Sequence, residues 1–207
     1  MNVLAAVIEF PFFNNKECEK LIKYAHKKEE YFIKKGNIAS DSSFYSKDQI
    51  NTANFYQYNF FKDNPKYIDR FLVCLKEILP WLKYPIAVQA WVNIYKTGEG
   101  IEWHNHAGLD GHSYTANIFL GGITEPGIKY TEPGKDETCI LNRVGEMLLC
   151  GCSLGHMVPP NQSDSPRYSV GMTIHDYEAI TKEIMSTLSI TSPYSKGIII
   201  LKEEAIK

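Results

Sequence analysis

The stretch Gln89-Ala-Trp-Val-Asn-Ile-Tyr95 alternates between two kinds of side chain and marks a change in the character of the chain. In an extended backbone, successive side chains point to opposite faces. One face would therefore carry Gln89, Trp91, Asn93 and Tyr95, and the other Ala90, Val92 and Ile94. This period of two, which starts near Pro85, indicates β-strands in the part of the chain that follows.

Further strand-like runs follow toward the C-terminus, separated by turns such as Gly121-Gly122, Pro126-Gly127 and Pro133-Gly134. Short strands at this spacing favour an antiparallel double-sheet barrel or jelly roll. The runs cover residues 113–120, 128–132, 146–150 and 168–174.

The N-terminal part of the chain contains two stretches with helical periodicity. Residues 16–28 carry apolar side chains on one face, and Asn14 or Asn15 precedes them as a helix cap. Residues 65–79 form a second such stretch, which Pro80 ends. We therefore expect two helices before the sheet.

The remaining segments give weaker signals. Residues 3–13 read as a strand, and the polar segment 34–54 has little period and is expected to be irregular. The tail is ambiguous: residues 178–188 are compatible with a helix and residues 197–201 with a final strand.

No repeat, low-complexity tract or linker divides the chain, so we expect a single domain over residues 1–207. Its helical part would cover 1–84, its jelly-roll core 85–177 and its tail 178–207. The predicted fold class is α+β, mainly β, with N-terminal helices that support the sheets.

Composition narrows the range of functions. Lys and Arg total 22 against 24 Asp and Glu, so a nucleic-acid partner is not expected. The five cysteines are odd in number and form no Cys-x-x-Cys pair, which indicates a reducing compartment rather than a disulfide framework. No apolar run is long enough to span a bilayer, and no targeting signal is recognised. A cytoplasmic protein is expected.

The histidines are concentrated in the β region. His104 and His106 form an H-x-H pair, whose imidazoles share a face if the backbone is extended. His156 follows 52 residues after His104, at the end of an apolar run. Two neighbouring ligands and a distant third could hold a metal ion, and imidazole suits Fe, Zn, Cu and Ni alike. His112 and His175 are expected to be hydrogen-bonded structural residues, and His26 is expected to be solvated.

Arg167 and Ser169 share a face at the start of the run 168–174 and follow His156 by 11 and 13 residues. A guanidinium binds a carboxylate through two parallel hydrogen bonds, and a hydroxyl adds a donor. The pair suits the far carboxylate of a dicarboxylate whose other end binds the metal. The alternative is an ordinary arginine at the start of a surface strand.

Taken in order, these pieces resemble the 2-oxoglutarate/Fe(II)-dependent dioxygenases of the double-stranded β-helix fold. Asn93-Ile-Tyr95, the glycines Gly98 and Gly100, and His104 are similar to the family pattern N-x-Y…G…H-x-D. A metal-ligating histidine and an arginine about ten residues later, as in the distal half of the family pattern, correspond to His156 and Arg167. The helix near residues 15–22 resembles that of prolyl-hydroxylase-like members.

The resemblance implies a ligand set and a reaction. His104, His106 and His156 would bind Fe(II), Arg167 and Ser169 would hold the C5 carboxylate of 2-oxoglutarate, and Asn93 and Tyr95 would contact this cosubstrate. With O2, the enzyme would hydroxylate a C–H bond and convert 2-oxoglutarate to succinate. A peptidyl proline or a small molecule would be the substrate. Neither its identity nor the oligomeric state follows from the sequence.

One departure concerns the second ligand, where the family has Asp or Glu and this chain has His106. A neutral imidazole in this place raises the net charge of the site by one unit and loosens its preference for Fe(II) over Zn or Ni. Asp110 is an alternative ligand that would have to reach back from a loop. Asn93, Asn105 and Asn117 are candidates to fix the imidazole tautomers.

Two other functions remain open: a cupin-like metal-binding jelly roll that does not use 2-oxoglutarate, and a non-catalytic binding domain. Three further groups of side chains lie near the motifs. Trp91 and Trp103 are expected to pack in the core, with Trp91 able to wall the pocket. Tyr114 could reach the cosubstrate, although the pattern does not fix its face. Cys150 and Cys152 are expected to be buried rather than to bind metal.

Overall fold

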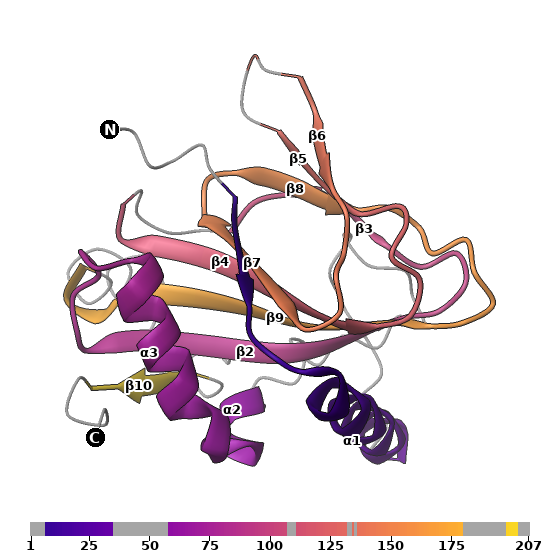
Figure 1. Ribbon diagram of the computed structural model, residues 1–207, viewed down its shortest axis with the longest axis horizontal. Coiled ribbons are helices and arrows are strands. Elements are labelled where there is room, and N and C mark those ends of the chain that lie inside the picture. The colour runs from indigo at the N-terminus through magenta and orange to yellow at the C-terminus, as the bar shows by residue number, and fades with distance from the viewer. Residues whose placement is uncertain are drawn as a thin grey trace.

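The computed structural model describes residues 7–34, 58–106, 111–131, 134, 136–179 and 198–202. Within them, two antiparallel sheets form the body of the protein (Figure 1). The larger sheet has the order β1-β7-β4-β9-β2-β10 and the smaller one β3-β8-β5-β6. The larger contains β1 (Ile8–Pro11), β2 (Ile86–Tyr95), β4 (Ser113–Gly121), β7 (Glu146–Gly151), β9 (Arg167–Asp176) and β10 (Ile199–Leu201); the smaller contains β3 (Ile101–His104), β5 (Ile128–Thr131), β6 (Thr138–Ile140) and β8 (Gly155–Val158).

The helices cover one face of the larger sheet (Figure 1). They are α1 (Asn15–Lys34), α2 (Phe60–Asp63), the 3-10 turn η3 (Pro65–Tyr67) and α3 (Ile68–Ile78). A capping box begins α1: Asn14 Oδ1 accepts from the Glu17 amide, and the Glu17 carboxylate accepts from the Asn14 amide, both at 3.0 Å. Of the two predicted cap residues, Asn14 and Asn15, the structure has Asn14 as the cap.

Alternation along the long strands divides the apolar residues into two clusters. Val92 of β2 and Val170 of β9 face the helices and belong to one buried cluster with Phe71, Leu72 and Leu75 of α3. A second cluster lies between the sheets and includes Tyr95, Ile101, Ile128, Tyr130, Leu148 and Val158. The larger sheet is therefore buried on both faces, with its inner face toward the smaller sheet.

The mainly β, double-sheet fold with N-terminal helices is the predicted one. The strand-like runs became β4, β5, β7 and β9, and the strand considered for the ambiguous tail, over residues 197–201, is observed as β10. Helix α1 is longer than the expected range 16–28, because no Gly or Pro interrupts it before Gly36. The strand expected over residues 3–13 is shorter among the described residues, where only β1 forms.

Four short elements were not predicted: α2, β3, β6 and β8, none longer than four residues. So few residues show no measurable periodicity. The irregular segment 34–54 and the helix over 178–188 fall almost wholly outside the described residues. The division of the chain at residues 84 and 177 stays a prediction.

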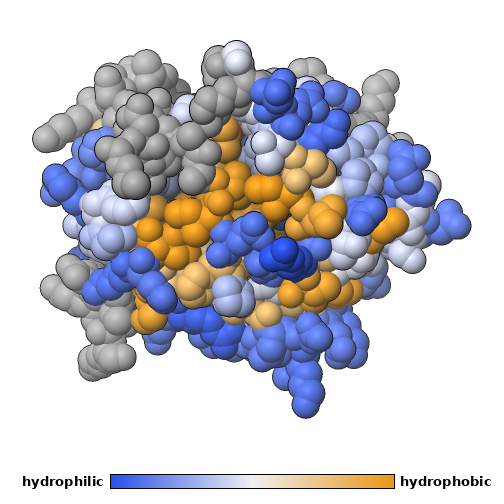
Figure 2. Space-filling model, turned by 45° about the horizontal axis from the view of Figure 1, so that its top comes forward, coloured by the Kyte–Doolittle hydropathy of each residue, from blue (hydrophilic) through white to orange (hydrophobic). Residues whose placement is uncertain are grey.

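Some apolar side chains also lie at the surface. Figure 2 shows one face on which apolar residues gather around hydrophilic ones. Trp81, Val73 and Leu141 are each about half exposed. Single exposed apolar residues are normal on protein surfaces, so these three carry no functional assignment. None of the described helices has both the length and the apolar character needed to cross a membrane.

Candidate metal centre and its pocket

The pairing of β3 with β8 places two of the histidines directly opposite each other. His104 and His156 are Cα partners in this antiparallel pair, and their ring centroids are 4.3 Å apart. Side chains of such partners lie on the same face of a sheet. The register of β3 shifts between Ile101 and His104, which lets both of these residues face the interior despite their odd spacing.

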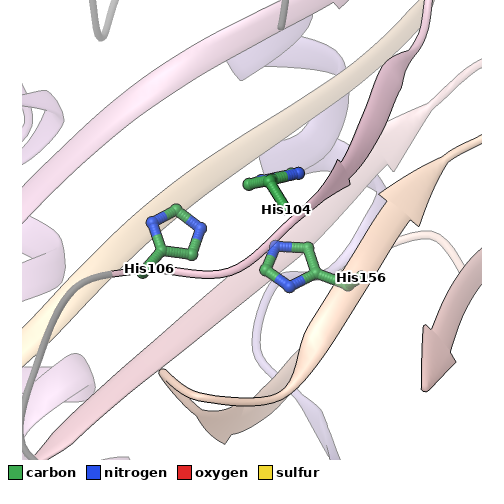
Figure 3. A group of neighbouring side chains, drawn as sticks. All are labelled: His104, His106 and His156. Atoms are coloured by element: carbon green, nitrogen blue, oxygen red, sulfur yellow. The ribbon is translucent and has the colours of Figure 1, made fainter. Parts of the chain in front are cut away.

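His106 follows the end of β3 and is anchored by its backbone. Its amide donates a 3.0 Å hydrogen bond to the carbonyl of Cys152, in the turn between β7 and β8. Its ring is stacked on that of His156, with centroids 5.2 Å apart and an interplanar angle of 16°. The three imidazoles therefore converge from β3, the loop after it and β8 (Figure 3).

One ligand atom from each of the three rings lies within 4.8 Å of the other two. Nitrogen ligands at about 2 Å from one ion are at most about 4 Å apart. Small rotations of the rings would therefore bring all three nitrogens onto a single ion. The donor set of three imidazoles fits iron, zinc, nickel or copper.

Backbone carbonyls orient two of the rings. Nδ1 of His104 lies 2.8 Å from the Glu102 carbonyl, and Nδ1 of His156 lies 3.1 Å from the Leu154 carbonyl. A carbonyl only accepts, so each Nδ1 carries the proton and each Nε2 keeps its lone pair for a metal. The partners of these two Nδ1 atoms are backbone carbonyls and not the candidate asparagines.

Burial keeps the cluster neutral. Desolvation, followed by the neighbouring imidazoles, lowers the pKa of His106 to about 3 and that of His156 to about 4. Burial also lowers the pKa of His104. The rings are therefore unprotonated near neutral pH, in the form that binds metal ions.

A pocket of about 500 Å³, open mouth included, lies between the two sheets beside the histidines. Its walls are mainly apolar and aromatic, with a few polar side chains. Among the lining residues are the predicted cosubstrate contacts Asn93 and Tyr95, together with Trp91, Thr115, Asn117 and Tyr130. Concave sites of this composition are typical of small-molecule binding.

Arg167 and Ser169 lie on the neighbouring strand, opposite these contacts. In the β2–β9 pair, Tyr95 is the Cα partner of Arg167 and Asn93 that of Ser169. Asn93 Nδ2 donates to Ser169 Oγ at 3.3 Å. Gly171, two residues further on the same face, lines the pocket. Arg167 and Ser169 therefore face the same interior, although neither lines the pocket itself.

The guanidinium of Arg167 is buried without a counter-charge. The residue is 2% exposed, and its Nη1 and Nη2 donate to the carbonyls of Pro159 and Pro126 at 3.2 and 3.3 Å. Its Nε has no hydrogen-bond partner, and no carboxylate in the described part of the chain forms an ion pair with it. Burial lowers its pKa. An unpaired buried charge is costly unless an anion is bound.

The other histidines have structural partners. His112 Nδ1 lies 3.2 Å from Asp176 Oδ2, and His175 Nδ1 lies 2.9 Å from Ser113 Oγ, which confirms the expected hydrogen-bonded roles. His26 is exposed, as expected, and its Nε2 also lies 2.8 Å from the Tyr168 hydroxyl. The alternative ligand, Asp110, lies outside the described residues.

The aromatic residues near the motifs lie in three different places, and Trp103, on β3, belongs to neither apolar cluster. Trp91 lines the pocket, with its ring centroid 6.1 Å from that of His106. Tyr114 belongs to the cluster under the helices and accepts a 2.8 Å hydrogen bond from Trp81, so it does not reach the pocket. Trp103 does not line the pocket either.

The two neighbouring cysteines are buried, as expected. Cys150 lines the pocket, and burial raises the pKa of its thiol to about 12. Tyr130 was not singled out from the sequence. Extending the period of two along residues 128–132 would have placed it on one face with Ile128.

No family model and no curated protein sequence matches the chain. Solved structures do. The non-heme α-ketoglutarate-dependent carbocyclase SnoK from nogalamycin biosynthesis matches with a TM-score of 0.59 at 15% identity, covering 88% of this chain and 86% of its own. A Pseudomonas putida prolyl-4-hydroxylase matches with a TM-score of 0.56 at 11% identity, covering 82% of this chain and 91% of its own.

HygX from Streptomyces hygroscopicus, solved with nickel and 2-oxoglutarate bound, matches with a TM-score of 0.58 at 11% identity, over 83% of each chain. The protein therefore has the fold of the 2-oxoglutarate/Fe(II) oxygenases, as its motifs indicated. At such low identities, the similarity extends to the fold alone.

Proposed function

We propose that the protein is a 2-oxoglutarate- and Fe(II)-dependent oxygenase that hydroxylates a C–H bond of a small molecule or a peptidyl proline. One observation carries the proposal: three neutral imidazoles and an unpaired, buried guanidinium face the same interior from opposite ends. A ligand that binds metal at one end and carries a carboxylate at the other would satisfy both.

The spacing along the strands supports a ligand of this kind. Strand β8 leads from His156 to Pro159, whose carbonyl contacts Arg167. Three residues of strand span roughly 10 Å. A five-carbon dicarboxylate bound to a metal through one end fits this span. On the opposite wall, β2 leads from Trp91, near His106, to Tyr95, the partner of Arg167.

The residues then have distinct roles. His104, His106 and His156 would hold Fe(II), which together with 2-oxoglutarate and O2 supplies the oxidising chemistry. Arg167 has five N–H donors and uses two, so Nε and one hydrogen on each terminal nitrogen are available to the C5 carboxylate. Ser169 would add a hydroxyl donor.

Asn93 and Tyr95 would line the cosubstrate along its length. The Oδ1 of Asn93 is buried and has no partner. Turning the amide over would let the Ser169 hydroxyl donate to Oδ1 and would present Nδ2 to a carboxylate. The apolar walls between the two ends would exclude water from the chain of carbon atoms.

A specific observation favours the cupin-like alternative, in which metal binds without 2-oxoglutarate. Both terminal nitrogens of Arg167 already contact carbonyls, and the residue does not line the pocket. In that alternative, Arg167 would only tie the loops at Pro126 and Pro159 to β9.

Anaerobic titration of the protein with Fe(II) and 2-oxoglutarate tests the proposal, since the chelate gives a metal-to-ligand charge-transfer band in the visible region. We expect this band in the wild type and in Arg143→Ala, a control at an exposed arginine paired with Glu9. Arg167→Ala should bind Fe(II) but lose most of its 2-oxoglutarate affinity. Metal binding with no band in the wild type would favour the cupin-like alternative.

The absence of stoichiometric metal would favour a non-catalytic binding domain. A cytoplasmic location and the choice between a peptide and a small molecule as substrate stay predictions. The titration does not depend on either of them.

A further inference from the structure

Tyr130 stands next to the histidine cluster without a role in the arrangement described above. It is the Cα partner of His156 in the β5–β8 pair, and the two ring centroids are 6.0 Å apart. The residue is 6% exposed and lines the pocket. It therefore occupies the wall of the pocket at the metal end.

The hydroxyl of Tyr130 forms no hydrogen bond with any described residue. The side chain packs among apolar neighbours that include Ile128, Leu148 and Cys150. The phenol of Tyr130 carries one O–H donor. On the wall of a pocket, such a donor can hydrogen-bond a ligand that is bound there.

The course of β5 shows which end of a bound ligand Tyr130 would meet. The carbonyl of Pro126 accepts from Arg167, and the chain then leads through Ile128 to Tyr130 beside His156. Strands β5 and β8 are antiparallel neighbours, so β5 runs from the Arg167 end of the pocket toward the histidines and β8 runs from the histidines toward the Arg167 end. Arg167 marks one end and Tyr130 the other, so Tyr130 is remote from the C5 carboxylate in the proposed arrangement.

We propose that the Tyr130 hydroxyl donates a hydrogen bond to the metal-proximal carboxylate of the 2-oxo acid held at the histidine cluster. This inference rests on the proposed function. It divides the recognition of the cosubstrate between two donors, a neutral phenol at the metal end and a guanidinium at the far end. Tyr130 would fix the orientation of the chelate and raise the affinity for 2-oxo acids as a class.

Calorimetric titration of the Co(II)-loaded protein with two probes tests this division. The first probe is 2-oxoglutarate, and the second is pyruvate, which has the 2-oxo acid group but no second carboxylate. A hydrogen bond to a charged group corresponds to roughly a ten- to hundredfold change in affinity. We expect Tyr130→Phe to weaken both probes by such a factor and Arg167→Ala to weaken only 2-oxoglutarate.

Tyr114→Phe is the matched control, because it removes a hydroxyl from the opposite face of the larger sheet. It should change neither affinity. Co(II) affinity and the thermal midpoint of the Co(II) form should be unchanged in Tyr130→Phe, which separates ligand recognition from folding.

Two results would overturn the inference while leaving the proposed function intact. In the first, Tyr130→Phe binds each probe with the same affinity as the wild type. In the second, Tyr130→Phe loses affinity for 2-oxoglutarate but not for pyruvate. Failure of the wild type to bind 2-oxoglutarate would instead reject the proposed function, and this inference with it. The absorption spectrum of Co(II) gives a second readout, since a reoriented chelate changes its d–d bands.

Discussion

His104 and His156 face each other across the β3–β8 pair, although 52 residues separate them in the sequence. Their position is set by backbone pairing and by the carbonyls that accept from each Nδ1. His106 lies beyond the strand; its amide donates to the Cys152 carbonyl, and its ring forms no hydrogen bond with a described residue. Two imidazoles are thus fixed by the sheet, and the third has more freedom to adjust to an ion.

Replacing any of the three histidines by alanine should abolish stable metal binding. Loss of an outer partner of a ligand already costs ten- to a hundredfold in metal affinity, so loss of a ligand should cost more than about a hundredfold. Metal analysis after dialysis measures the effect, and titration with Co(II) gives the affinity.

His112→Ala is the control for this series, because His112 lies in the same region but pairs with Asp176. It should retain a full equivalent of metal. If His106→Ala also retained it while His104→Ala and His156→Ala did not, His106 would not be a ligand, and Asp110 would become the candidate for the third position.

The tautomers offer a second prediction. His104 and His156 should carry their protons on Nδ1 in the metal-free protein, because a carbonyl lies within hydrogen-bond distance of each Nδ1. Two-bond 15N–1H correlation spectra distinguish the two neutral tautomers. A proton on Nε2 in either ring would contradict the assignment of that nitrogen as the metal ligand.

How far the sequence predicted this arrangement depended on the length of each element. The 10-residue β9 and the 9-residue β4 have enough alternation to be recognised, and both were predicted as strands. Strands β3 and β8 have four residues each. They carry His104 and His156, so the site lies on the elements that periodicity could not detect.

The H-x-H motif and its spacing to His156 still identified the residues that the structure brings together. The pairing register that brings them together could not be read from the sequence, because it depends on contacts between distant segments. The same is true of the carbonyls of Glu102 and Leu154, and of the cross-strand position of Tyr130.

The contact between Gly171 and Trp91 gives a third prediction. A Cβ at position 171 would lie 2.8 Å from Cε2 and Nε1 of Trp91, so the indole would have to move. Gly171→Ala should lower the free energy of unfolding by about 1–3 kcal/mol. It should also weaken metal binding, because Trp91 packs near His106. Urea unfolding and Co(II) titration measure the two effects.

Trp91→Phe provides the matching test, since the smaller ring leaves room for the added methyl group. The double variant should be more stable than the sum of the two single changes predicts, which is a favourable coupling in a double-mutant cycle. Strictly additive losses would mean that the methyl group is accommodated by movement of β9 instead.

The buried imidazoles predict how stability depends on pH. Burial is the main cause that lowers the pKa of His106 to about 3 and the pKa values of His156 and His175 to about 4. An unfolded chain takes up these protons near pH 6.5. Below that pH the unfolded state binds more protons than the folded state, so the metal-free protein should lose stability as the pH falls from about 6.5 toward 4.

Urea unfolding of the metal-free protein at pH 7.5, 6 and 5 measures this loss, which should amount to a few kcal/mol because one pKa unit corresponds to about 1.4 kcal/mol. His175→Gln removes one of the titrating rings outside the three-histidine cluster and should flatten the profile. A profile that is equally steep in this variant would show that His175 is not protonated differently in the two states. A flat profile in the wild type would mean that the imidazoles are hydrated in the folded protein, contrary to the burial that keeps them ready to bind metal.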